Sequence, residues 1–473
     1  MNIVFDWTPF QDFIQLPPAE AIWLLLSNYG WIAFGIVFLI GARDVWLYYI
    51  RRKWSEGHKW ILLAIDIPKG NEQTPKAVEN MFTYLGGAHG SQNFYEKWIA
   101  GEYQKSFSYE IVSLEGYTQF LIRTPAEYRN LIESSVYSQY PDAEISEVDD
   151  YVNTVPPSYP DSDWDIFGSE FILQNPWYIP IKTYPEFEYK SGPLETQFKD
   201  PMALLMDLCS TLRQGEQFWF QMIVTPTGFD WVKGSQDQMN KILGRKKKAK
   251  PSLFLRLLGW VGDLSEVIFP IWQDAQPNKD PDTSKTMFDL TPVEARQLEG
   301  IHQKSTKMGF NAKIRIIYVA RKEVMNKAKV VNGFVGYIKQ FISLDLNSFK
   351  PDLKRTMTKA VYFNKARRLA RKKRNIFNNY INRSNCGREP YLLNIEELAT
   401  LWHFPVEANV KSAMIQKVPG RKADAPSSLP IPDLTKTITP DFTSDLLVKE
   451  EDFKQQPSQQ SDNQGAPDNL PFV

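Results

Sequence analysis

One uncharged apolar run near the N-terminus constrains this chain more than any other feature of its sequence. The run extends from Ala21 to Ala42 and contains no charged side chain. A helix of that length, rising about 1.5 Å per residue, is about 33 Å long. It would therefore cross a hydrocarbon core of about 30 Å. The sequence predicts a single-pass transmembrane helix at residues 21–42.

The charges on the two sides of the run predict its orientation. The charged residues that precede the run are all acidic, and four cations follow it closely: Arg43, Arg51, Arg52 and Lys53. By the positive-inside rule, the N-terminal residues 1–20 lie outside the cell and the rest of the chain lies in the cytoplasm. We expect a protein of the cell (inner) membrane with a juxtamembrane segment at 43–58 and a cytoplasmic body.

Two other interpretations of the run stay open. A signal peptide could be cleaved after the small pair Gly41-Ala42, but the usual basic residues are missing ahead of the run. A buried core helix is the second alternative, although such a helix more often carries charges on one face. Aromatic residues gather toward both ends of the run, as in the interfacial belts of membrane proteins: Trp23, Trp31, Trp46, Tyr48 and Tyr49.

Charge and cysteine content exclude several classes of function. The 473 residues include 55 basic and 55 acidic side chains, so no global field attracts nucleic acid and only local patches can do so. Cys209 and Cys386 are the two cysteines and lie far apart in the sequence. This usage argues against a disulfide scaffold or a thiolate metal site and suits a reducing cytoplasm.

Residues 59–150 predict a ferredoxin-like α+β domain. An apolar strand at 60–67 is followed by a helix that begins after Thr74-Pro75. A hairpin turns at Glu115-Gly116, and the residues Thr124 to Glu127 are typical of a capping box that opens a second helix. With a last strand at 143–148, the order is βαββαβ, the order of the split βαβ sandwich. That fold hosts many unrelated functions.

A second α/β unit is predicted at residues 164–345, with an insertion at 227–290. Its clearest strands alternate apolar and polar residues at 218–224 and 312–320, and Thr291 to Glu294 forms another capping box. A helical or docking segment at 351–405 follows. A tail rich in Pro, Ser, Asp and Gln at 422–473 is typical of disorder. The predicted fold class is therefore α+β behind one transmembrane helix.

Motifs of known catalytic and cofactor sites are missing from the sequence. It contains no G-x-x-x-x-G-K-[ST] phosphate loop, no H-E-x-x-H or C-x-x-C pair and no G-x-S-x-G nucleophile elbow. The glycines at 86–90 follow a helix, where they end it, and not a strand as in dinucleotide sites. We expect a non-enzymatic protein without cofactor or metal. A catalytic site built from distant residues is the alternative, which would appear as a deep pocket with converging titratable groups.

A first basic run leads into an apolar stretch that is too short to span a membrane. Cations followed by a Trp-bearing apolar helix are typical of an interfacial membrane contact. The candidate residues for it are Arg245, Lys246, Lys247, Lys248, Leu255, Leu258 and Trp260. The alternative is a surface lysine loop that leads into a core helix, and the composition favours it slightly.

A second basic run lies on a predicted helix with an interrupted apolar stripe. Its candidate binding residues are Lys365, Arg367, Arg368, Arg371, Lys372, Lys373 and Arg374. Binding to nucleic-acid phosphates is one use of such a patch. A solvated helix or an acidic protein partner is the favoured use, because no base-reading module accompanies the patch. Ion pairs with the acidic residues between 142 and 150 are a further alternative.

Several segments together resemble one protein family. Residues 392–405 are similar to a segment just ahead of the motor in bacterial conjugation-type ATPases, the type IV secretion and HerA/FtsK-like DNA-transfer proteins. Residues 138–145, Asp200-Pro201 and residues 215–221 resemble the membrane-anchored N-terminal region of that family, a domain of unknown function. The similarity extends from about residue 60 to residue 432.

The resemblance implies a docking helix and a partner. Asn394 and Glu397 form a helix cap whatever the family, and the resemblance makes Glu397, Leu398, Leu401 and Trp402 the docking helix. In the family a proline-rich link then leads into a Walker-type ATPase, whereas here a predicted disordered tail takes its place. The resemblance implies a scaffold or adaptor of a type IV secretion-like or conjugative DNA-transfer machine, within an oligomeric complex that includes a separate P-loop ATPase. The rival hypothesis is a membrane-tethered nucleic-acid-binding protein that uses residues 365–374.

Overall fold

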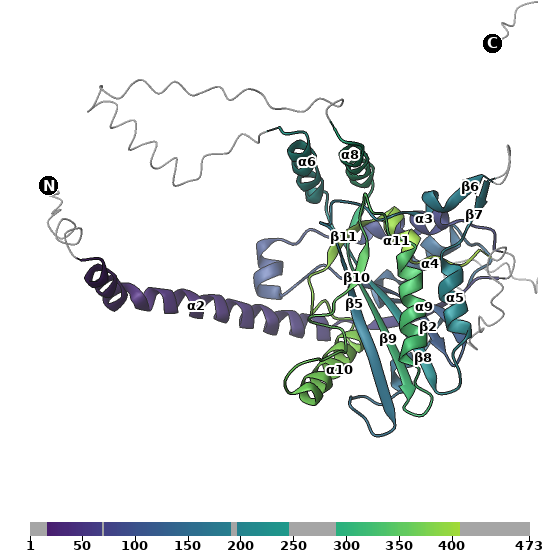
Figure 1. Cartoon of the computed structure of the whole chain (residues 1–473), viewed down its shortest axis with the longest axis horizontal. Coiled ribbons are helices and arrows are strands. Elements are labelled where there is room, and N and C mark those ends of the chain that lie inside the picture. Colours follow the sequence, from purple (N-terminus) through teal and green to yellow (C-terminus); the bar gives the residue numbers. More distant parts are fainter. Residues whose placement is uncertain (1–16, 69–70, 191–195, 246–289, 407–473) are drawn as a thin grey trace, which may run out of the picture. The chain divides into compact units, whose positions relative to one another are not determined.

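The computed structural model describes residues 17–68, 71–190, 196–245 and 290–406 (Figure 1). Most of the predicted outer segment 1–20, most of the insertion 227–290 and the whole predicted tail 422–473 lie outside the described residues. The described elements alternate between helix and strand, and the predicted α+β class is confirmed.

The N-terminal apolar run belongs to one continuous helix, α2 (Pro18–Glu56). Proline suits the first position of the helix, because it has no N–H there that would lack a carbonyl acceptor. The helix ends at Gly57. The part from Gly30 to Glu56 is long and apolar enough to cross a membrane, and its most apolar window has no residue buried in the protein. The helix continues without a break through most of the predicted juxtamembrane segment 43–58, as far as Glu56. An exposed apolar helix at this place is consistent with a membrane anchor or with a signal sequence.

The body is built on a nine-stranded antiparallel sheet. Eight strands follow the order β10-β5-β9-β8-β2-β3-β1-β4, and β11 also pairs with β9. The strands are β1 (Trp60–Asp66), β2 (Phe107–Leu114), β3 (Tyr117–Pro125), β4 (Glu144–Glu147), β5 (Trp164–Leu173), β8 (Glu216–Pro226), β9 (Gly309–Arg321), β10 (Phe349–Pro351) and β11 (Tyr391–Asn394). A separate small hairpin pairs β6 (Glu188–Lys190) with β7 (Thr196–Phe198).

Each half of the sheet has the same chain order. In the first half, β1, α3 (Pro75–Leu85), β2, β3, α4 (Arg129–Tyr137) and β4 follow one another as the sequence predicts. In the second half, β5, α5 (Met202–Ser210), β8, β9, α9 (Lys327–Lys339) and β10 repeat that order. The helices α6 (Asp230–Ile242) and α8 (Pro292–Ser305) lie between β8 and β9. Helix α6 falls within the predicted insertion 227–290, and α8 begins directly after it.

The two halves join through β2 and β8. These strands pair along their length, from Phe107 opposite Val224 to Leu114 opposite Gln217. Within its own half, β2 lies at the edge opposite β4, and β8 lies at the edge opposite β10. The pairing of β2 with β8 therefore covers two strand edges that would otherwise be open. The units predicted at 59–150 and 164–345 therefore contribute to one continuous sheet.

The two faces of the sheet have different covers. On one face, α3, α4, α5, α9 and α11 (Ile395–Leu401) pack over the larger apolar cluster (Figure 1). On the other face, α10 (Lys365–Ile381) and the segment around Tyr151 cover a smaller cluster that includes Trp219 and Phe377. Both faces of the central strands are thus buried.

One local prediction is wrong. Thr124 does not cap the helix after β3, because it pairs with Ile61 as part of that strand. The chain continues through a short 3-10 turn at Ala126–Tyr128, and α4 begins at Arg129. The capping boxes at Thr291 and at Asn394, in contrast, are both present.

Candidate functional site

The helix α10 carries the whole predicted basic patch and lies on the second face of the sheet. It contacts β5 and β9, and its inner side buries Ile376, Phe377 and Tyr380. The apolar positions recur at helical spacing, so that one stripe faces the sheet and the remaining circumference faces outward. Its N-terminal neighbour Asn364 adopts a left-handed conformation, with φ of 53°, which turns the chain sharply into the helix.

The seven predicted cations of α10 divide into two groups. Lys373 is buried and forms an ion pair with Asp165 of β5, and Lys372 donates to the main-chain oxygens of Leu353, Met357 and Lys359. These two lysines fix the helix to the body. The remaining cations point to solvent: Lys365, Arg367, Arg368, Arg371 and Arg374. We call these five side chains the outer cations.

Exposed apolar side chains directly precede the outer cations. Val361, Tyr362 and Phe363 are 62 %, 73 % and 92 % exposed. Three adjacent large apolar side chains at this level of exposure form an apolar patch, and such patches are candidate contact sites for another molecule. Nothing in the sequence pattern separates these three residues from an ordinary loop, so sequence reasoning missed them.

A row of buried polar side chains lies beneath α10 and runs straight across the sheet. Glu170 of β5 is paired in register with Arg315 of β9, Arg315 with Gln221 of β8, and Gln221 with Glu110 of β2. All four side chains are fully buried. The guanidinium of Arg315 donates to Oε1 of Glu170 at 2.8 Å, and Gln221 donates to Oε1 of Glu110 at 3.0 Å.

Arg383 closes one end of this row. Its guanidinium donates to both oxygens of Glu110, at 3.0 and 3.1 Å, and to Asp150 at 2.9 Å. The hydroxyl of Tyr151 donates to Glu110 at 2.8 Å. Burial raises the pKa of Glu110, but the charge of Arg383 and these hydrogen bonds outweigh it and hold the pKa below its usual value. Glu110 is therefore an ionised carboxylate in the protein interior.

The segment after α10 closes the other end of the row. Arg315 donates to the main-chain oxygens of Asn379, Ser384 and Cys386, and Lys313 of β9 donates to those of Asn385 and Cys386. Burial lowers the pKa of Lys313 to about 8; the charge of Glu170 offsets this effect only in part, and the nearby charge of Arg315 adds to it. The chain between α10 and β11 is thus attached to the sheet by buried charges.

The geometry makes α10 a rigid support for its outer cations. Each buried charge of the row has a partner of opposite sign or a main-chain oxygen, so the row has the features of a structural network and not of a reacting centre. Losing any partner would leave a charge buried and uncompensated. The outer cations can neutralise a polyanion or an acidic protein surface without reorganisation of their helix.

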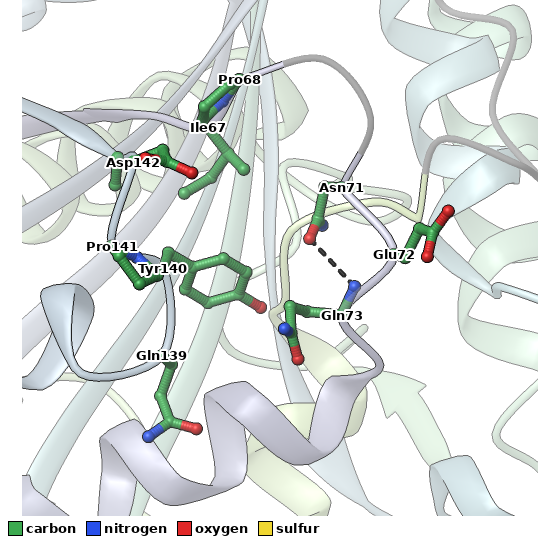
Figure 2. Close-up of a pocket in the computed structure, with 10 residues that line it drawn as sticks. Ile67, Pro68, Asn71, Glu72, Gln73, Gln139, Tyr140, Pro141 and Asp142 are labelled. Carbon is green, nitrogen blue, oxygen red and sulfur yellow. Dashed lines mark hydrogen bonds between the residues drawn. The ribbon is translucent and has the colours of Figure 1, made fainter. Parts of the chain in front are cut away.

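A second candidate is a cavity of about 310 Å³ at the β4 end of the sheet, shown in Figure 2. The loop after β1, with Ile67, Asn71 and Gln73, forms one wall, and residues 139–143 form the other. The phenol of Tyr140 is buried, packs on Phe404 and has no hydrogen-bond partner for its hydroxyl. The burial raises the pKa of that phenol. This cavity can hold a small polar group, but it brings together no nucleophile and base.

The predicted docking helix is α11, and its residues are internal. Glu397, Leu398, Leu401 and Trp402 have no exposed surface. Glu397 forms a fully buried ion pair with Lys304 at 2.9 Å and accepts a hydrogen bond from the main chain of Ile181. These side chains stabilise this chain's own fold. A partner would meet them only if α11 left the body.

The predicted interfacial contact is outside the described residues except at its start. Arg245 is exposed directly after α6, whereas Lys246, Lys247, Lys248, Leu255, Leu258 and Trp260 lie in the part of the chain that is not described. Within the described part, no three His, Cys, Asp or Glu side chains gather as they would around a metal ion. His403 lies in the core, where its Nε2 pairs with Asp200 at 2.9 Å.

Comparison with known proteins gives a family without an assigned activity. Residues 58–407 match the family described as a domain of unknown function, DUF8128. None of the curated proteins matches this chain. The matched residues begin just after α2 and end just after α11, so the family domain includes the whole sheet and both of its covers.

Proposed function

The chain belongs to the DUF8128 family, and from this premise we propose that it is a non-enzymatic, membrane-anchored scaffold or adaptor whose body faces the cytoplasm. The observation that carries the proposal is the exposed apolar surface of α2, which runs directly into a folded body. Cations follow the apolar part on the body side alone, as expected for an anchor with its body in the cytoplasm.

We propose further that the scaffold works in a type IV secretion-like or conjugative DNA-transfer machine, beside a separate P-loop ATPase. The resemblance of residues 138–145, 215–221 and 392–405 to the N-terminal region of such motors supports this assignment. The outer cations of α10 are the surface that we assign to the partner, because their helix is fixed to the sheet on its opposite side.

Recovery of the complex from native membranes tests the proposal. Full-length protein is extracted in mild detergent, captured through an added tag, and its partners are identified by mass spectrometry. We expect a P-loop ATPase among the partners, and we expect Arg367→Glu, Arg371→Glu and Arg374→Glu together to release it. A control with the same change in net charge reverses the exposed residues Lys241, Lys339 and Lys350. Recovery without any such ATPase would contradict the assignment.

Nucleic-acid binding through α10 is the second candidate function. The exposed rings of Tyr362 and Phe363 next to the outer cations favour it, since single strands are bound by stacking platforms beside basic grooves. Each lost stacking contact should cost about 1–3 kcal/mol of binding free energy. Tyr362→Ala with Phe363→Ala should therefore weaken binding to single-stranded DNA, whereas Arg371→Glu should reduce its salt dependence. Absence of salt-dependent binding by the unmodified protein would exclude this function.

A further inference from the structure

The loop between α3 and β2 exposes a group of large apolar side chains that the sequence analysis did not single out. Phe94, Tyr95 and Ile99 are 75 %, 63 % and 52 % exposed, and they lie within six residues of one another. We call residues 93–101 the aromatic loop. Its composition differs from that of an ordinary surface loop, in which apolar residues occur singly.

The aromatic loop has a defined structure. The side chain of Asn93 accepts from the main chain of Glu96 at 2.9 Å, and the carboxylate of Glu96 accepts from the main chain of Asn93 at 2.9 Å. A π-helical turn follows at Glu96–Ala100, and it brings the ring of Trp98 to 6.2 Å from that of Phe94. Turns of this type are often found at functional sites. The exposed side chains are therefore held in place.

The loop packs directly on α2 through its π-helical turn. Figure 1 draws this part of the chain as the short, unlabelled blue helix near α2. The indole N–H of Trp46 donates to the main-chain oxygen of Trp98 at 3.0 Å. Gly101, with φ of 76°, lies so close that a Cβ atom there would be 2.6 Å from the carbonyl group of Ile50. The loop and this part of α2 thus form one surface.

The contact lies at a defined level along the proposed anchor. Trp46 follows Ala42, the last residue of the apolar run, by four residues, which is about 6 Å along a helix axis. That level corresponds to the headgroup region, where Trp and Tyr side chains concentrate. Trp46, Tyr48 and Tyr49 of α2 are themselves at least half exposed.

Exposed cations belong to the same two segments as this aromatic surface, and one of them, Arg43, is paired with Asp44 at 2.7 Å. Arg43, Lys53 and Lys97 are exposed, and the ammonium of Lys97 lies 5.9 Å from the ring centre of Trp98. Apolar rings beside basic side chains fit an anionic bilayer surface, which accepts rings at its boundary and pairs its phosphates with cations. Because this surface continues the apolar surface of α2, a bilayer accounts for it better than a separate protein partner.

We propose that the aromatic loop inserts Phe94, Tyr95 and Ile99 into the boundary between headgroups and acyl chains of the membrane that holds α2. This proposal rests on the proposed membrane anchor. The loop and the helix together would then hold the body at a fixed angle and height above the bilayer, whereas a single helix would let the body rotate freely.

Depth-dependent quenching in lipid vesicles tests the proposal on the full-length chain. Cys386 is replaced by Ser, and Cys209 is buried, so that one new cysteine can carry an environment-sensitive fluorophore. Four variants are labelled: Phe94→Cys and Ile99→Cys in the loop, Leu39→Cys in α2 and Leu344→Cys as an exposed apolar control that is 96 % exposed. The vesicles contain phosphatidylcholine and phosphatidylglycerol with a doxyl quencher placed high or low on the acyl chain.

Each outcome decides one of the two proposals. We expect the shallow quencher to reduce the fluorescence at positions 94 and 99 severalfold more than at Leu344→Cys, and the deep quencher to act most strongly on Leu39→Cys. Quenching at position 39 with none at 94 and 99 would overturn the loop proposal and leave the anchor intact. No quenching at position 39 would overturn the anchor, and quenching at 94 and 99 alone would establish a surface contact without it.

Discussion

Glu110 joins several segments that cover the second face of the sheet. It lies in the middle of a central strand, is fully buried, and accepts hydrogen bonds from Arg383, Tyr151 and Gln221. A buried ion pair contributes little net stability over an apolar replacement, but the loss of one partner is costly. The stability of the α10 cover is therefore sensitive to this one carboxylate.

Replacing the carboxylate tests this dependence. Glu110→Gln keeps the shape of the side chain but leaves Arg383 with less compensation, so we expect a loss of about 3–5 kcal/mol in the free energy of unfolding at neutral pH. Chemical denaturation of the full-length protein in detergent measures it. The exposed substitution Glu323→Gln serves as the control, and a loss no larger than that of the control would contradict the role of Glu110.

The pH dependence of this effect has a definite sign. The folded protein holds the pKa of Glu110 below the usual value of 4.5, so its contribution is fully present above pH 4.5 and is lost as the pH falls through the lowered pKa. The difference in stability between wild type and Glu110→Gln should shrink as the pH falls from 4.5 through the lowered pKa, because below that pKa both proteins carry an uncharged group at this position. A difference that stays constant over this range would assign the effect to packing.

Gly101 is the residue that lets the aromatic loop approach α2. Both its φ of 76° and the 2.6 Å distance from an added Cβ to the Ile50 carbonyl oppose any side chain. We expect Gly101→Ala to separate the loop from the helix and to raise the amide hydrogen exchange of residues 93–101 markedly. Gly87→Ala is the matched control, since an added Cβ there has no neighbour within 4 Å. Unchanged exchange in Gly101→Ala would contradict the close packing.

At the scale of the element, α10 separates what a sequence pattern can predict from what it cannot. Its helical spacing predicts both the helix and an apolar stripe; the helix is confirmed, and the stripe is buried in its C-terminal part, at Ile376, Phe377 and Tyr380. The pattern could not tell Lys372 and Lys373 from the outer cations, because the distinction depends on Asp165 and on main-chain oxygens that only the fold brings close. Charge alone does not reveal which lysine is structural.

The two groups of cations should respond differently to substitution. Lys373→Ala removes a buried ion pair and should cost about 1–3 kcal/mol of folding stability. Arg371→Ala changes an exposed side chain two residues earlier on the same helix and should change stability by at most about 0.5 kcal/mol. Thermal unfolding of the two variants compares them directly. Equal losses in both would mean that Lys373 does not fix the helix.

The same limit explains what was missed in the sheet. The alternation in β2 predicts a strand with one apolar side, but Ser108 and Glu110 on the other side are buried as well. Glu110 accepts hydrogen bonds from Ser108, Tyr151 and Arg383, two of which come from distant parts of the chain. The strands β11 and β9 are far apart in the sequence, and no local sequence pattern predicts that they pair. Thr124 illustrates the converse error: a good local capping pattern loses to strand pairing. The local sequence thus predicts which segments form helices and strands, whereas contacts between distant residues decide how these elements pair and pack.

At the scale of the whole molecule, the continuous sheet couples the two halves of the body. The contact between β2 and β8 extends over eight residue pairs, and helices of both halves contribute to one apolar cluster. Neither half could unfold without exposing the edge and part of the core of the other. A body of this kind should behave as one cooperative unit and keep α10 at a fixed position relative to α2.

Paired core substitutions test this coupling. Leu63 of β1 and Leu205 of α5 are fully buried in opposite halves, and each change to Ala should cost about 2–5 kcal/mol. If the sheet unfolds as one unit, either substitution lowers the midpoint of the same single transition in calorimetry, and both halves lose amide protection together. Two transitions, each sensitive to one substitution only, would mean that the halves are independent domains. A scaffold that holds a partner at a fixed distance from the membrane requires the first behaviour, because a body that opened between β2 and β8 would uncouple α10 from α2.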